Sequence, residues 1–202
     1  MPVDVTEPIT PPASDTAPRK RWTRKECELL DAMGVWNGQR LELIDGELID
    51  KRMPKNPPHI LAVILLHEWL AAIFGFLRVR KEDPIDVATA DNATSEPEPD
   101  LVVLRESARH FPNANPSPQD VELIVEVSES TLFFDLNKKA PIYARAGIPE
   151  YWVLDINLRR LIVHREPLDG KYHSIKIYHQ DERVSPLAAP GSEFRVAQAF
   201  ED

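Results

Sequence analysis

The chain has 202 residues, with 24 Lys and Arg against 33 Asp and Glu, which gives a formal net charge of −9 and a pI near 5.2. This length fits one compact domain, and a hydrophobic content of 43% with 28% charged residues excludes a fibrous or wholly disordered protein. The acidic balance argues against a protein that coats nucleic acid nonspecifically, because such binding depends on neutralising phosphates with Lys and Arg.

The N-terminal segment and the cysteine content indicate a protein of the reducing cytoplasm. Cys27 is the single cysteine, so the chain can form neither an internal disulfide nor a cysteine-based zinc cluster. Residues 1–20 are rich in Pro, Thr and Asp, whereas an export signal would need a basic start and then an apolar run. We therefore expect 1–20 to be a flexible leader and 21–202 to be a single domain.

Two short elements are expected at the start of this domain. Thr23 and Glu26 have the spacing of a capping box, which predicts a short helix that ends at Gly34. Asp45-Gly46 separates two apolar runs, 41–44 and 47–49, and this dipeptide accepts the positive φ angles of a type I′ turn. The pattern predicts a β-hairpin.

The remainder alternates between strand and helix patterns. Residues 59–76 form an apolar stretch interrupted by His67 and Glu68, which favours a buried helix over a membrane span. A second helix is expected at 134–146. Strands are expected at 79–81, 85–88, 100–104, 121–127, 150–155, 160–165 and 172–178. This order predicts a mixed sheet with helices packed against it, of the α/β or α+β class.

Acidic residues are concentrated in 81–130, where twelve Asp and Glu face three basic residues. For Glu82, Asp83, Glu96 and Glu98 a solvated acidic face is the better explanation. Glu126 differs, because the strand period of two places it between aliphatic neighbours, on the face opposite Val121, Leu123, Val125 and Val127. A buried carboxylate needs a compensating cation, so Glu126 is either half of a structural ion pair or part of a charged site.

Asp100 begins another apolar strand, directly after the Glu-Pro-Glu-Pro run at 96–99. If the two strands are neighbours, Asp100 and Glu126 converge. Two carboxylates suit a hard cation such as Mg²⁺, which takes oxygen ligands and can activate water against a phosphodiester. Lys139, thirteen residues after Glu126, could then orient the water or stabilise charge on the phosphate.

At this point the sequence resembles the Uma-type endonuclease family of the PD-(D/E)xK restriction-endonuclease-like superfamily. The resemblance covers about residues 22–180. The matching stretches are 41–48, His59, 98–100, 125–128, 130–131, Asp135, Lys139, Tyr143 and 147–152.

The resemblance implies a restriction-endonuclease-like α/β fold with an αβββαβ core, to which an N-terminal helix and a hairpin are added. It implies that Asp100 and Glu126 are catalytic residues and metal ligands, with Glu42 as a further acid near the metal. The implied cofactor is Mg²⁺, with Mn²⁺ as a substitute. His59 is implied to contact the substrate or the metal.

The chain departs from the superfamily pattern at Ser128, which stands two residues after Glu126 where a lysine is expected. The next helix offers Lys138 and Lys139. We favour Lys139 as the catalytic lysine, because Asp135, Lys139 and Tyr143 share one helix face, and Lys138 remains the alternative or a substrate contact.

The predicted function is a Mg²⁺-dependent endonuclease acting on phosphodiester bonds, most plausibly in DNA. The alternative is an inactive nuclease-like domain that binds nucleic acid or protein. Basic clusters at 19–25 and 159–176 would track a phosphate backbone or simply balance the acidic region, and a homodimer would double this basic rim. No Gly-x-Ser-x-Gly elbow surrounds Ser128 or Ser130, which argues against a serine hydrolase.

Overall fold

The computed structural model describes residues 19–51 and 56–200, so residues 1–18 of the predicted leader lie outside the described part. Its centre is a six-stranded mixed sheet. All neighbouring strands are antiparallel except β5 and β6, which are parallel. The strand order across the sheet is β3 (Val79–Lys81), β4 (Leu101–Leu104), β5 (Val121–Ser128), β6 (Glu150–Asp155), β7 (Arg160–Leu168) and β8 (Lys171–His179).

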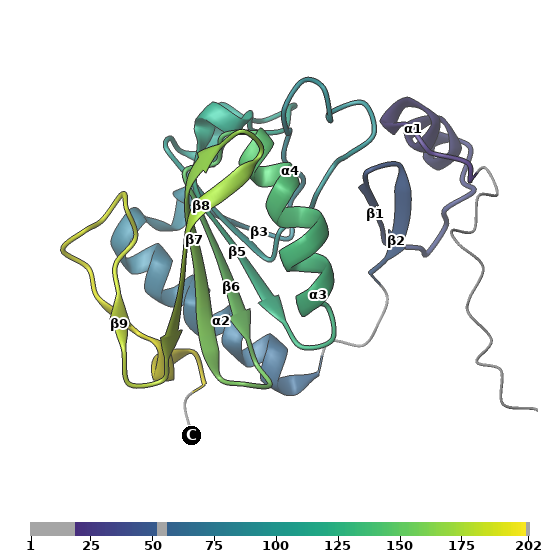
Figure 1. The fold of residues 1–202 in the computed structure, drawn as a ribbon. Helices are drawn as coiled ribbons and strands as arrows, with labels where there is room; N and C mark the ends of the chain where they lie inside the picture. The colour runs from purple at the N-terminus through teal and green to yellow at the C-terminus, as the bar shows by residue number, and fades with distance from the viewer. Residues whose placement is uncertain (1–18, 52–55, 201–202) are drawn as a thin grey trace, which may run out of the picture.

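Helices cover both faces of this sheet (Figure 1). The long helix α2 (Pro57–Phe74) lies on one face, and a helical run of three parts lies on the other. In chain order the central elements are α2, β3, β4, β5, the helical run and β6. The run consists of α3 (Leu132–Phe134), a π-helical turn η4 (Asp135–Lys139) and α4 (Ala140–Arg145).

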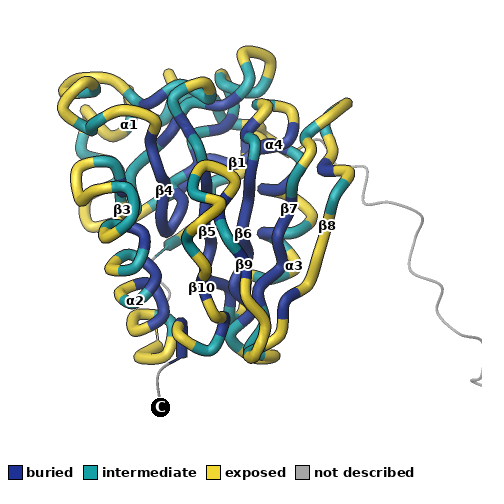
Figure 2. Tube along the Cα trace, turned by 90° about the vertical axis from the view of Figure 1, so that its left-hand side faces the viewer, coloured by how far each residue is buried: buried dark blue, intermediate teal, exposed yellow. Residues whose placement is uncertain are grey.

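The α2 face of the sheet is covered by an apolar cluster. Ala62, Val63, Leu66 and Leu70 are the buried residues of α2, and they pack against strand residues such as Trp152. Among the described helices only α2 is long and apolar enough to cross a membrane, a criterion that core helices also meet. The expectation of a buried helix is correct for one side only, because the outward side is exposed (Figure 2).

A second apolar cluster lies under α4 and contains Ile124, Tyr143 and Val153. The expected alternation along β5 holds for Leu123, Val125 and Val127, which belong to the α2 face. The prediction was wrong for Val121, which lies under α4. A register shift between Val103 and Leu104 changes the pairing at this end of β5 and turns Val121 to the other face.

The N-terminal helix and hairpin have the predicted form. In α1 (Arg24–Ala32) the capping box is present, with the Glu26 amide donating to Thr23 Oγ1 and the Thr23 amide to Glu26 Oε2. β1 (Leu41–Ile44) and β2 (Glu47–Asp50) pair as an antiparallel hairpin, and the turn residues Asp45 and Gly46 have φ angles of 49° and 76°. The hairpin is a separate two-stranded sheet beside the main one (Figure 1).

The predicted strand at 85–88 is not a strand. The amides of Ile85 and Asp86 donate to the carbonyls of Pro97 and Pro116, which belong to loops, so this extended segment joins no ladder. The other predicted strands and helices are present with ends shifted by a few residues. Elements that were not predicted are β9 (Arg183–Val184), β10 (Phe194–Arg195) and the 3₁₀ turns Phe76–Arg78, Ala108–His110, Pro118–Asp120 and Val196–Ala199.

Candidate active site

Neighbouring strands bring two buried carboxylates together. Asp100 stands directly before β4 and Glu126 lies in β5, and the antiparallel register pairs Leu101 with Val125. The Asp100 amide lies 3.4 Å from Glu126 Oε2, and the Val127 amide donates to Asp100 Oδ2 at 2.9 Å. The convergence of Asp100 and Glu126, expected only if their strands were neighbours, is therefore present.

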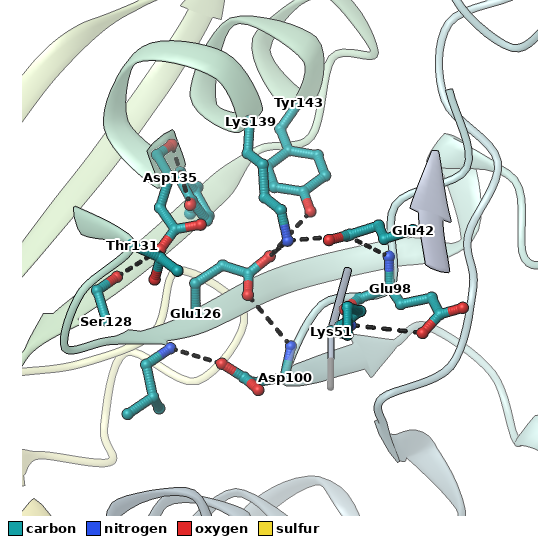
Figure 3. A network of polar contacts seen from close by, with 12 residues as sticks. Glu42, Lys51, Glu98, Asp100, Glu126, Ser128, Thr131, Asp135, Lys139 and Tyr143 are labelled. Atoms are coloured by element: carbon teal, nitrogen blue, oxygen red, sulfur yellow. Dashed lines mark hydrogen bonds and ion pairs between the residues drawn. The ribbon is translucent and has the colours of Figure 1, made fainter. Parts of the chain in front are cut away.

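The π-helical turn η4 supplies the lysine. Lys139 is 4% exposed, and its Nζ lies 2.9 Å from Glu126 Oε1 and 2.8 Å from Glu42 Oε1 (Figure 3). Lys138 is exposed and does not line the site. The structure thus brings Lys139 to the acids and leaves Lys138 outside. The wider π turn buries both of its end residues, Asp135 and Lys139.

Glu42 reaches the site from the hairpin, which is not part of the main sheet. Its Oε1 also accepts the Glu98 amide at 2.8 Å. Lys51, just after β2, donates to the Glu98 carbonyl at 2.7 Å. An isolated β-bridge between Leu43 and Glu96 also links the hairpin to this segment. The hairpin is therefore fixed against the 96–100 segment, and Glu42 becomes the third acid around Lys139.

Further polar residues support the site, and the sequence analysis assigned them no role. Tyr143 donates its hydroxyl to Glu126 Oε1 at 3.1 Å. Ser128 and Thr131 both donate to Asp135 Oδ2, each at 2.7 Å. The available signal was the period of two in β5, which places Ser128 on the same face as Glu126, together with the shared helix face of Asp135 and Tyr143.

The acids and Lys139 line one cavity of about 620 Å³. His59, near the start of α2, also lines it. Its Nε2 is buried without a hydrogen-bond partner and lies 3.5 Å from Asp100 Oδ1. Of the predicted site residues, the structure gathers Glu42, His59, Asp100, Glu126 and Lys139 around this cavity.

Negative charge exceeds positive charge in this buried cluster. Burial raises the pKa of Glu126 to about 8, although Lys139 opposes this rise. Burial also raises the pKa of Asp135. Burial alone would lower the pKa of Lys139, but the Glu126 and Glu42 carboxylates raise it well above its usual value. The ammonium is thus charged and shared, and one lysine does not compensate all the surrounding carboxylates.

The donor set fits a hard divalent cation. Asp100 and Glu126 offer carboxylate oxygens within one cavity, and the orphaned Nε2 of His59 lies beside them. No group of three or more His, Cys, Asp or Glu in the described chain forms a ready-made metal cage. Mg²⁺ needs no such cage, because it is usually bound by one or two carboxylates, several waters and substrate phosphates. The excess of carboxyl groups over lysines in the cavity lining points the same way.

Many charged residues outside this cluster form ion pairs. The acids expected to form a solvated face are paired instead: Glu82 with Arg40, Asp83 with Arg80, Glu96 with Arg24 and Glu98 with Lys51. Many residues of the two basic clusters are also bound to acids. These pairs are Lys20 with Glu26, Arg21 with Asp45, Arg24 with Asp86, Arg160 with Asp155 and Arg165 with Glu150.

The fold and the family of this chain support a nuclease. Residues 27–197 match the model of the Uma2 family, described as "Putative restriction endonuclease". The chain belongs to this family, as its sequence motifs indicated.

One solved structure, a "putative nuclease belonging to DUF820" from Anabaena variabilis, is similar with a TM-score of 0.61 and 16% identity. The likeness covers 85% of this chain and 96% of that one, and at this identity it establishes the fold alone. No curated protein matches the chain.

Proposed function

We propose that this protein is a Mg²⁺-dependent endonuclease that hydrolyses phosphodiester bonds in DNA, with Mn²⁺ able to replace Mg²⁺. One observation carries the proposal. Asp100, Glu126 and Lys139 come from three separate elements, yet they meet at one cavity, with the lysine ammonium 2.9 Å from the Glu126 carboxylate. Two carboxylates that can hold a metal ion and a cation beside them suit the metal-assisted hydrolysis of a phosphodiester.

In this proposal Asp100 and Glu126 hold the metal ion. A bound Mg²⁺ would lower the pKa of a coordinated water and polarise the phosphate. An ammonium has three donors, and Lys139 gives two of them to Glu42 and Glu126. The third is available to orient the attacking water or stabilise the charge that develops on the phosphate. Glu42 keeps the ammonium in place, and His59 Nε2 is placed to contact a phosphate oxygen.

The test is incubation of supercoiled plasmid with the purified chain in Mg²⁺, in Mn²⁺ and in EDTA, with Glu126→Gln measured beside it. We expect nicking or linearisation that requires metal. The substitution should reduce the cleavage rate at least about 100-fold, because it removes a charged metal ligand from a nearly isosteric side chain.

Lys138→Gln is the matched control, since it removes a neighbouring lysine that does not line the cavity. It should cleave at a rate close to that of the wild type. Equal activity in Glu126→Gln, or cleavage that persists in EDTA, would contradict the proposed mechanism. No cleavage of duplex DNA, single-stranded DNA or RNA would favour a binding module.

A further inference from the structure

The cavity has two kinds of wall. The acids and Lys139 form its charged part, whereas an apolar part of its lining includes Ile49 and Phe134. Phe134 and Ile49 are partly buried and pack on a small cluster of Ile44, Val87 and Ile142. A metal ion and one phosphate do not need such an apolar wall, so it requires a separate explanation.

The charge of the lining argues against a track for a polyanion. The described lining contains six carboxylates and two lysines. Lys139 is bound to Glu42 and Glu126, and Lys51 is bound to Glu98. Binding of duplex nucleic acid normally depends on Lys and Arg that neutralise several phosphates. The described lining does not provide such contacts, so an interaction of another kind is needed to hold the substrate at this cavity.

We propose that the apolar wall is a subsite for an unpaired nucleobase, which lies against Phe134 while its phosphate faces the Lys139 side of the cavity. The inference rests on the proposed nuclease function and specifies its substrate class. A base inside a duplex has no free face for an aromatic ring and must first leave the stack, whereas a base in a single strand offers this face at little cost. The cavity volume of about 620 Å³ lies within the range of small-ligand pockets.

The consequence is a preference for single-stranded over duplex DNA. The subsite also predicts that the base itself contributes to the affinity, in addition to the backbone. Base stacking on an aromatic side chain tolerates every base, so little sequence preference is expected at this position.

The experiment uses fluorescence anisotropy with the full-length Glu126→Gln chain in Mg²⁺, so that binding is measured without cleavage. Three probes of equal length are compared: a single-stranded oligothymidine, a strand of abasic residues with the same backbone, and a duplex. We expect the abasic strand to bind about 5- to 150-fold more weakly than oligothymidine, which corresponds to the stacking of one base. The duplex should also bind more weakly than the single strand.

Substitutions at Phe134 test the wall itself. Phe134→Ala should reduce the affinity for oligothymidine to that for the abasic strand, whereas Phe134→Trp should retain it. Phe133→Ala is the matched control, because Phe133 is 78% exposed and does not line the cavity. Thermal unfolding of each variant shows whether it is folded, and the probe comparison on the unaltered wall stands even if Phe134→Ala does not fold.

Equal affinity for the abasic strand and oligothymidine would overturn the inference, as would tighter binding of the duplex. So would equal losses in Phe134→Ala and Phe133→Ala. These outcomes leave the proposed nuclease function intact, because that function is judged by metal-dependent cleavage and its loss in Glu126→Gln. A failure of cleavage together with base-dependent binding would instead identify a binding module for unpaired strands.

Discussion

Two glutamates are buried in adjacent strands of the same sheet and have opposite surroundings. Glu150 in β6 is fully buried, and its Oε1 accepts from Trp152 Nε1 at 2.8 Å and from Arg165 at 2.6 and 2.9 Å. Its Oε2 accepts the Leu187 amide at 2.7 Å. Glu126 in β5 also accepts from the Tyr143 hydroxyl and the Asp100 amide, but it shares its one cation with Glu42 and lines a cavity.

The difference separates a structural carboxylate from one suited to chemistry. At Glu150 the Arg165 guanidinium and the Leu187 amide compensate the charge, and the group does not line the cavity that holds Glu126. At Glu126 compensation is incomplete, and burial raises the pKa to about 8. Burial of an acid alone therefore does not indicate a chemical role. The balance between carboxylates and the donors around them is more informative.

Among the single substitutions, the largest loss of stability is expected from Glu150→Gln. The amide keeps one acceptor, but its NH₂ group would face either Arg165 or the Leu187 amide, both of which are donors. We expect a loss of about 3 kcal/mol in the free energy of unfolding, or roughly 6–12 °C in melting temperature. Chemical denaturation measures it. The folded fraction should cleave normally, and a loss of activity without a loss of stability would break the comparison.

The second prediction concerns the pH dependence of stability in EDTA. The folded protein retains a proton on Glu126 up to about pH 8, whereas the unfolded chain releases it near 4.5. Stability contributed by this group is therefore complete below pH 4.5 and lost as the pH rises to about 8, with a slope of up to about 1.4 kcal/mol per pH unit.

Comparison of the wild type with Glu126→Gln isolates this contribution, because both share every other titrating group. One such group is His164, whose pKa is lowered by burial. The variant should gain stability relative to the wild type as the pH rises. Parallel pH profiles of the two proteins would show that Glu126 is as well compensated as Glu150.

The smallest effect is expected from Tyr143→Phe, which removes one donor to Glu126 and keeps the ring in a fully buried position. Burial and the Glu126 charge raise the pKa of Tyr143 well above its usual value, so the hydroxyl remains a donor. Hydrogen bonds to charged groups are the stronger ones. We expect a loss of about 1 kcal/mol at pH 9 and a smaller loss at pH 6, measured by denaturation. An equal loss at both values would place the ionisation of Glu126 outside this range.

Much of the fold could be predicted because local chemistry determines it. The Thr23–Glu26 capping box and the Asp45-Gly46 turn each act within a few residues, and both have the expected geometry. The period of two along β5 placed Glu126 among buried positions. The predicted strand at 85–88 was wrong because a β-rich composition does not determine which groups the backbone bonds to. Two backbone amides of this segment bond to carbonyls in loops later in the chain.

The placement of the site residues was less predictable from local patterns than the fold was. The convergence of Asp100 and Glu126 depended on strand adjacency, which the patterns did not determine alone. The contact of Glu42 with Lys139 joins residues almost a hundred positions apart and was not predicted, since the family resemblance indicated only that Glu42 lies near the site. The π turn at 135–139 has no local signature in the sequence. Ser128 and Thr131 were not predicted as partners of Asp135 because their role depends on a side-chain geometry that spacing does not specify.

The single parallel pair in the sheet explains why a lysine can be absent from the strand and present in the cavity. Parallel strands cannot be joined by a tight turn, so the chain must cross over the sheet between β5 and β6. That crossover begins directly after Ser128, becomes helical at Leu132 and brings Lys139 back to Glu126. An ammonium carried by the crossover can occupy the space that a strand residue would otherwise fill. A lysine ammonium can therefore lie beside Glu126 even though the lysine stands thirteen residues further along the chain. A search for a fixed Glu-x-Lys spacing would overlook it.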